Sequence, residues 1–80
     1  MKIVKKNIRG YYGMNHLAGK ELKIKCTPSM NTIYINKSLK GRFKRQVIAH
    51  EKIELWLMKN KHMKYKTAHN IAEKFDKNIR

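Results

Sequence analysis

The stretch VIAHEKIELWLM, residues 47–58, differs by one letter from HExxH, a helical motif in which two histidines bind zinc and the glutamate acts as general base. Glu54 stands where the second histidine of that motif would be. Residues four apart on a helix are neighbours, so His50 and Glu54 can bind one ion from a rigid scaffold. The spacing predicts a metal site in which a carboxylate replaces one imidazole.

The helical face around His50 favours this interpretation. At 100° per residue, Phe43, Val47 and Leu57 share a face with His50 and Glu54. A carboxylate among apolar side chains is costly unless it is paired or bound to a metal. The alternative is an ordinary helix stabilised by glutamate–lysine pairs. That alternative lacks its usual support, because the residue four positions after each glutamate of the motif is apolar.

A second histidine–glutamate pair follows in the chain. His69 and Glu73 are again four residues apart, and Asp76 falls on the same helical face. If this second helix is antiparallel to the first, His69 can join His50 and Glu54 around one ion. Two histidines and a glutamate are the ligand set of thermolysin-type zinc enzymes, which keep the fourth position open for water or substrate.

The neighbouring residues suggest catalytic roles. Glu51 would be the general base that activates a metal-bound water, and Tyr65 would stabilise an oxyanion. Glu73 would either orient a ligand histidine or serve as an additional metal ligand. His69 and Glu73 could equally be a solvated pair on a helix surface, in which case His62 is the replacement third ligand.

Length and charge limit the class of protein. Eighty residues predict one domain with a small core, to which a bound metal would add useful stability. A net charge of +15 favours polyanionic partners, above all nucleic acid. The basic residues are spread along the chain, without interleaved aromatic residues, so a lysine-rich solvated surface is the alternative.

The location follows from cysteine content and hydropathy. The single cysteine, Cys26, cannot form an internal disulfide and is expected to be a small buried residue in a reducing compartment. The sequence contains neither a long apolar run nor a secretory signal, so no membrane association is expected. We therefore expect a cytoplasmic protein.

The elements that position these residues are expected in the order strands, then helices. Apolar residues alternate with lysines over residues 21–27, and residues 31–36 are rich in β-branched side chains, so each segment predicts a strand. We expect the two strands to pair antiparallel through the turn PSMN. Helices are expected over 42–60, with Asn36 or Ser38 as N-cap, and over 65–78. The fold class is therefore α+β, a small antiparallel sheet of at least two strands packed against two C-terminal helices.

The other segments give weaker signals. Residues 2–10 are ambiguous between a strand and a helix start, and the glycine-rich segment 8–22 predicts a loop. Trp56 is expected in the core. Tyr11 and Tyr12 are expected to pack over the sheet, with a substrate rim as the alternative. His16 and His62 are expected to be plain surface residues in loops.

Two quoted segments resemble a known family. TIYINKSLKGRFKRQVIAHEKIELWL resembles the core of minimal zincin metallopeptidases, in which an edge strand precedes the active-site helix and lines the substrate cleft. HMKYKTAHNIAEKFD is similar to the later segment of small phage- and archaeal-type proteins that carry an HExxE helix. The resemblance covers residues 31–76. It implies a zincin-like fold with His50, Glu54 and His69 as zinc ligands and Glu51 as catalytic acid/base.

Three functions fit these observations. The first is a minimal zinc-dependent metallopeptidase that acts on a peptide or protein held as an added strand along residues 32–36. The second is a non-enzymatic basic module that binds nucleic acid and keeps the histidine–glutamate cluster as a structural feature. The third is a zincin-derived regulator that has lost turnover. The presence of Glu51 favours an enzyme, because a purely structural site does not need this acid.

Overall fold

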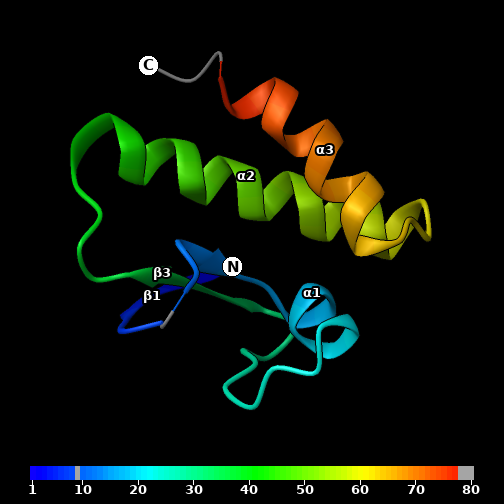
Figure 1. The fold of residues 1–80 in the computed structure, drawn as a ribbon, viewed down its shortest axis with the longest axis horizontal. Helices are drawn as coiled ribbons and strands as arrows, with labels where there is room; N and C mark the ends of the chain where they lie inside the picture. The colour runs from blue at the N-terminus through cyan, green and yellow to red at the C-terminus, as the bar shows by residue number, and fades with distance from the viewer. Residues whose placement is uncertain (9, 78–80) are drawn as a thin grey trace.

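The computed structural model describes residues 1–8 and 10–77. The elements in chain order are β1 (Lys2–Lys6), β2 (Gly13–Met14), α1 (His16–Glu21), β3 (Thr32–Asn36), α2 (Gly41–Asn60) and α3 (Tyr65–Asp76). Figure 1 shows α2 lying over the sheet and α3 crossing α2 as it returns in the opposite direction. The predicted α+β class, with a small sheet packed against two C-terminal helices, is confirmed.

The sheet has three strands in the order β1-β3-β2 and is mixed. β1 pairs with β3 in parallel and β2 pairs with β3 antiparallel. The strand expected over 31–36 is confirmed as β3, but it is the central strand. β1 pairs along the whole of β3, and β2 occupies its other edge opposite Tyr34 and Ile35, so the expectation that a peptide substrate lies as an added strand along residues 32–36 is wrong.

Alternation along β3 explains how the sheet holds α2. Ile33 and Ile35 are completely buried and form a core cluster with Leu39 and Val47. Burial of each isoleucine side chain contributes roughly 1.5–3 kcal/mol. Val47 lies one turn before His50 on α2, so the contact between sheet and helix fixes the face that carries the HExxE residues.

Residues 21–27, expected to be a strand, instead end α1 and form the turn after it. Asn15 sets the start of α1, because its side-chain oxygen accepts a hydrogen bond from the Ala18 N–H at 2.9 Å. The helix therefore begins inside the segment expected to be a loop. Cys26, expected to be buried, is exposed in this turn because no strand forms there to bury it.

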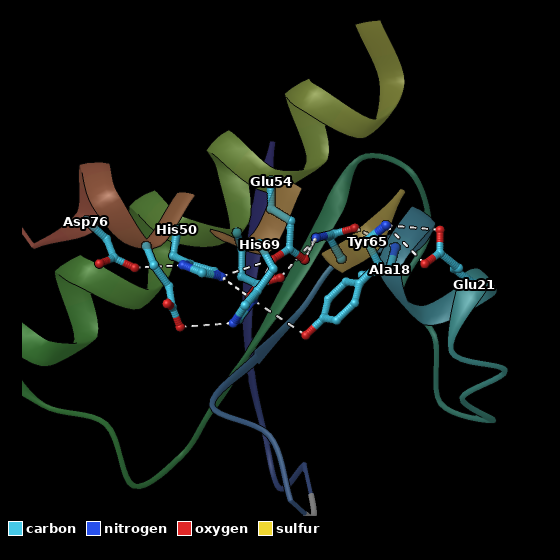
Figure 2. A network of polar contacts seen from close by, with 10 residues as sticks. Ala18, Glu21, His50, Glu54, Tyr65, His69 and Asp76 are labelled. Carbon is cyan, nitrogen blue, oxygen red and sulfur yellow. Dashed lines mark hydrogen bonds and ion pairs between the residues drawn. The ribbon is translucent and has the colours of Figure 1, made fainter. Parts of the chain in front are cut away.

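Neither of the two residues expected to cap α2 does so, and the hydroxyl of the second, Ser38, donates to Asn36 Oδ1 at 2.9 Å. The Asn36 side chain, one of the two expected caps of α2, instead donates to the carbonyls of Ile8 and Tyr11, at 3.0 and 3.1 Å. Lys40 is the N-cap of α2 and makes no side-chain capping bond. At α3, both carboxylate oxygens of Glu21 accept from the Tyr65 N–H at 3.0 Å, so α1 caps α3 (Figure 2).

The two long helices lie close to their expected bounds. The helix expected over 42–60 is Gly41–Asn60, and the one expected over 65–78 is Tyr65–Asp76, with position 78 outside the described residues. Trp56, expected in the core, is 53% exposed because it lies on the side of α2 away from the face that packs on the sheet. Among the described residues, no helix is long and apolar enough to cross a membrane.

Candidate metal centre

The two helices bring three predicted ligands together (Figure 2). His50 Nε2 lies 2.9 Å from Glu54 Oε2 and 3.0 Å from His69 Nδ1, and the triangle closes with 3.1 Å between His69 Nδ1 and Glu54 Oε2. His50 and Glu54 are buried, with Glu54 only 1% exposed, and the His69 side chain is partly open to solvent. The antiparallel crossing of α2 and α3 thus completes a set that α2 alone cannot form.

The triangle fits a tetrahedral ion. Zinc bonds of about 2.0–2.2 Å at tetrahedral angles place neighbouring ligand atoms about 3.3–3.6 Å apart. The observed separations of 2.9–3.1 Å need to open by only a few tenths of an ångström. Two imidazole nitrogens and one carboxylate oxygen already converge on one point, so these residues suit zinc. Among the residues that the structure describes, they form the candidate metal-binding group.

Each of the three ligands is held at its far side. Asp76 Oδ2 lies 2.6 Å from His50 Nδ1, and Glu73 Oε1 lies 3.0 Å from His69 Nε2. A carboxylate on the second ring nitrogen fixes the tautomer in which the first nitrogen can bind a metal, and it strengthens that nitrogen as a donor. Glu73 was expected either to orient a histidine or to be a ligand, and its position on the outer nitrogen of His69 favours the orienting role.

The outer partner of Glu54 is Asn15, a contact that the sequence did not predict. Its side-chain Nδ2 donates to Glu54 Oε1 and to Glu51 Oε1, each at 3.0 Å. Asn15 is completely buried, and the oxygen of the same amide caps α1. Asn15, which precedes Glu54 by 39 residues in the chain, therefore turns Glu54 Oε2 towards the histidines. The available signal was Asn15 as an N-cap before a run of helix-forming residues.

Glu51 lies beside the ligands without joining them. It lines a cleft of about 550 Å³ together with His50, His69 and Tyr65. Burial and the neighbouring Glu54 carboxylate raise the pKa of Glu51 well above its usual range. A carboxyl group with a raised pKa is suited to accept and return a proton near neutral pH, which is the property that a general base in this cleft needs.

Tyr65 reaches the same cleft from the first turn of α3. Its hydroxyl oxygen lies 3.5 Å from His69 Nδ1. Burial and the nearby Glu54 carboxylate raise the pKa of Tyr65 to about 12, so its hydroxyl keeps its proton at neutral pH and can donate a hydrogen bond into the cleft.

The remaining histidines lie elsewhere. His62 is exposed in the turn between the helices and is not part of the group that could hold a metal, so His69 is the third member and no replacement is needed. His16, expected in a loop, is the first residue of α1. Tyr11 and Tyr12 line the cleft, which favours the substrate-rim alternative over packing on the sheet.

The metal-free protein is expected to lose stability as pH rises from about 6.5 to 9. Burial lowers the pKa of His50, but hydrogen bonds to Glu54 and Asp76 outweigh it and raise the pKa from 6.5 to about 9. The stabilisation from protonated His50 is therefore complete below pH 6.5 and is lost as pH passes through 9. The raised pKa of Glu51 acts in the same direction, because an unfolded chain releases that proton at lower pH.

Zinc should reverse this trend, because it displaces the protons that the ligands otherwise bind. Melting temperatures measured across this range, in chelator and in excess zinc, test both statements. We expect the chelated protein to melt lower at high pH and the zinc-induced rise to grow. A melting temperature of the chelated protein that does not change with pH would contradict the arrangement around His50.

Comparison of the chain with family models, with curated proteins and with solved structures found no match. The functional conclusion therefore depends on the geometry of the site itself.

Proposed function

We propose that this protein is a minimal zinc-dependent metallopeptidase of zincin-like type. The observation that carries the proposal is the triangle of His50 Nε2, Glu54 Oε2 and His69 Nδ1, with every side 2.9–3.1 Å long and every ligand held by an outer partner. Three ligands leave one position for water and substrate, the arrangement of catalytic rather than structural zinc sites. The single cysteine supports a cytoplasmic location.

The residues of the cleft would have different roles in hydrolysis. An ion bound by the triangle would supply Lewis acidity and make water more acidic. Glu51 would accept the proton of the attacking water and return it to the leaving amine. Tyr65, which stays protonated, would donate a hydrogen bond to the oxygen that gains negative charge.

β2 offers a backbone edge on which a peptide could align. The Asn36 N–H donates to the Tyr12 carbonyl at 2.8 Å, and the pairing continues with Gly13 opposite Ile35. In an antiparallel ladder the residue after a bonded pair directs its N–H and C=O away from its partner, so those of Gly13 point to the free edge of the sheet. A Cβ at Gly13 would lie 2.7 Å from Glu51 Cγ, so this edge adjoins the general base.

An aromatic pair borders the same cleft. Tyr12 and Phe43 stack edge to face with ring centroids 5.0 Å apart, and both are largely exposed. Both line the cleft together with Val47. A substrate with an apolar side chain near the scissile bond would bury these rings, so we expect peptides of that kind to be preferred.

Zinc content and peptide hydrolysis test the proposal together. Protein purified without added chelator should contain stoichiometric zinc, should melt at a lower temperature after chelation, and should cleave members of a peptide library next to apolar residues, as identified by mass spectrometry. Absence of bound metal, with no change in melting on chelation, would overturn the proposal. Bound zinc without cleavage of any peptide would instead favour the zincin-derived regulator.

A further inference from the structure

A second cavity, of about 470 Å³, lies at the C-terminal end of α1, outside the metal centre. It is lined by the segment that includes Lys20, Lys23 and Lys25, and by His16 at the start of α1. In Figure 1 this segment lies beside α1 on the side away from α3. We propose that the cavity binds a backbone phosphate of a nucleic acid. The proposal does not depend on the proposed peptidase activity.

Lys23, which lines the cavity, ends α1 in a left-handed backbone conformation. The N–H of Lys23 donates to the Lys20 carbonyl at 3.2 Å, and the N–H of Ile24 donates to the Gly19 carbonyl at 2.9 Å. These two bonds form a Schellman motif, whose left-handed position is usually glycine. Lys23 occupies that position with φ 58°. Lys23 thus keeps a lysine side chain at the wall of the cavity, at a position that glycine would occupy with less strain.

The segment around the cavity carries a net positive charge. Glu21 is the one acid between residues 16 and 29, and both of its oxygens accept from the Tyr65 N–H. Its charge is therefore held against the start of α3. The other four acids of the chain, Glu51, Glu54, Glu73 and Asp76, belong to the metal centre. The five acidic side chains of the protein therefore have their own partners, and none of those partners is a lysine of the cavity.

His16 forms one wall of the cavity, and its ring is held in place by the backbone. Its Nδ1 lies 2.8 Å from the Pro28 carbonyl, which can only accept, so Nδ1 carries the proton of the neutral ring. The three ammonium groups of Lys20, Lys23 and Lys25 line the same cavity, and they can recognise a phosphate as a cluster of point charges.

The net charge of +15 favours a polymer over a free phosphate, because each neutralised phosphate of a nucleic acid releases condensed counterions. A different explanation is that Lys20 and Lys23 only offset the negative end of the α1 dipole. The two explanations differ in what happens when Lys23 is replaced by glycine, the residue that the Schellman motif prefers.

Lys23→Gly separates folding from binding. Relief of the left-handed conformation should raise the melting temperature by about 3 °C. Affinity for a single-stranded RNA oligonucleotide should fall roughly fivefold at about 0.1 M salt, and the slope of log affinity against log salt should become shallower by roughly 0.7. Fluorescence anisotropy across a salt series measures both quantities. Zinc content should not change.

Two matched variants complete the test. His62→Gly also replaces a left-handed residue, φ 54°, and should stabilise the protein without changing RNA affinity. Lys66→Ala removes an equal charge from an exposed position on α3 and should change affinity much less than Lys23→Gly. Unchanged RNA binding by Lys23→Gly, or an equal loss in Lys66→Ala, would overturn the proposal. Binding of inorganic pyrophosphate that depends on Lys23, without RNA binding, would overturn the assignment to a polymer.

Discussion

Glu54→Gln should abolish zinc binding at micromolar metal while leaving the protein folded. Glutamine has the shape of glutamate, and its amide oxygen can keep the hydrogen bond from Asn15 that now reaches Glu54 Oε1. Its amide nitrogen then faces His50 Nε2 and His69 Nδ1, where Oε2 now lies within 2.9 and 3.1 Å. An N–H group cannot bind a metal, and it can donate to an imidazole nitrogen, so the variant exchanges a metal site for a hydrogen bond.

Competition with a chromogenic zinc chelator measures this loss, and circular dichroism checks the fold. Glu73→Gln is the matched control, because it changes a carboxylate that contacts the outer nitrogen of His69. Loss of such an outer partner typically costs 10–100-fold in metal affinity, and the loss in Glu54→Gln should clearly exceed that range. If the two variants lost affinity equally, Glu54 would not be a ligand.

The long helices and the central strand were predictable, because their patterns are local. α2 and α3 carry their signals over 20 and 12 residues, and β3 is a short β-branched run. β2 has two residues, too few for any period to appear. Glycine in a sequence predicts a loop, yet Gly19 lies within α1, where an added Cβ would come within 2.6 Å of Thr27 Oγ1. Glycine is needed at this position for close packing against Thr27. From the sequence alone, such a glycine cannot be distinguished from one that forms a turn.

Helical spacing was enough to predict the three candidate ligands of the site. The spacing of His50 and Glu54 fixes one edge of the triangle, and an antiparallel second helix supplies His69. Asp76 could be placed on the same face as His69, but its contact with His50 depends on how the two helices cross. Asn15 could not be placed at all, because its contact with Glu54 arises only when α1 packs against α2.

This division has a physical meaning for the site. The pairs His50–Glu54 and His69–Glu73 each lie four residues apart on one helix, which sets their spacing by itself. The joining of the two pairs, and the contacts of Asp76 and Asn15 with them, come from tertiary packing. A metal site formed in this way is assembled only by the complete fold, so zinc binding and folding should be coupled.

Glu51→Gln should leave zinc bound and reduce peptide hydrolysis by roughly 10²–10⁴-fold, the usual contribution of a general base. Glu51 lies outside the triangle of ligand atoms, and its Oε1 accepts from Asn15 at 3.0 Å, a bond that the amide oxygen of glutamine can keep. The substitution therefore removes the ability to accept a proton and leaves the surroundings unchanged. It should also stabilise the metal-free protein at neutral pH, because burial penalises the charged carboxylate and not the amide.

Turnover at saturating zinc, zinc stoichiometry and thermal melting together check the role of Glu51. A higher melting temperature with zinc retained and hydrolysis lost is the combination expected of a buried general base. Full activity in Glu51→Gln would exclude that role, and loss of zinc would make Glu51 a ligand. Glu54→Gln should give the complementary result, with zinc and turnover lost together. The two glutamates of one HExxE turn would then be separated by experiment into a base and a ligand.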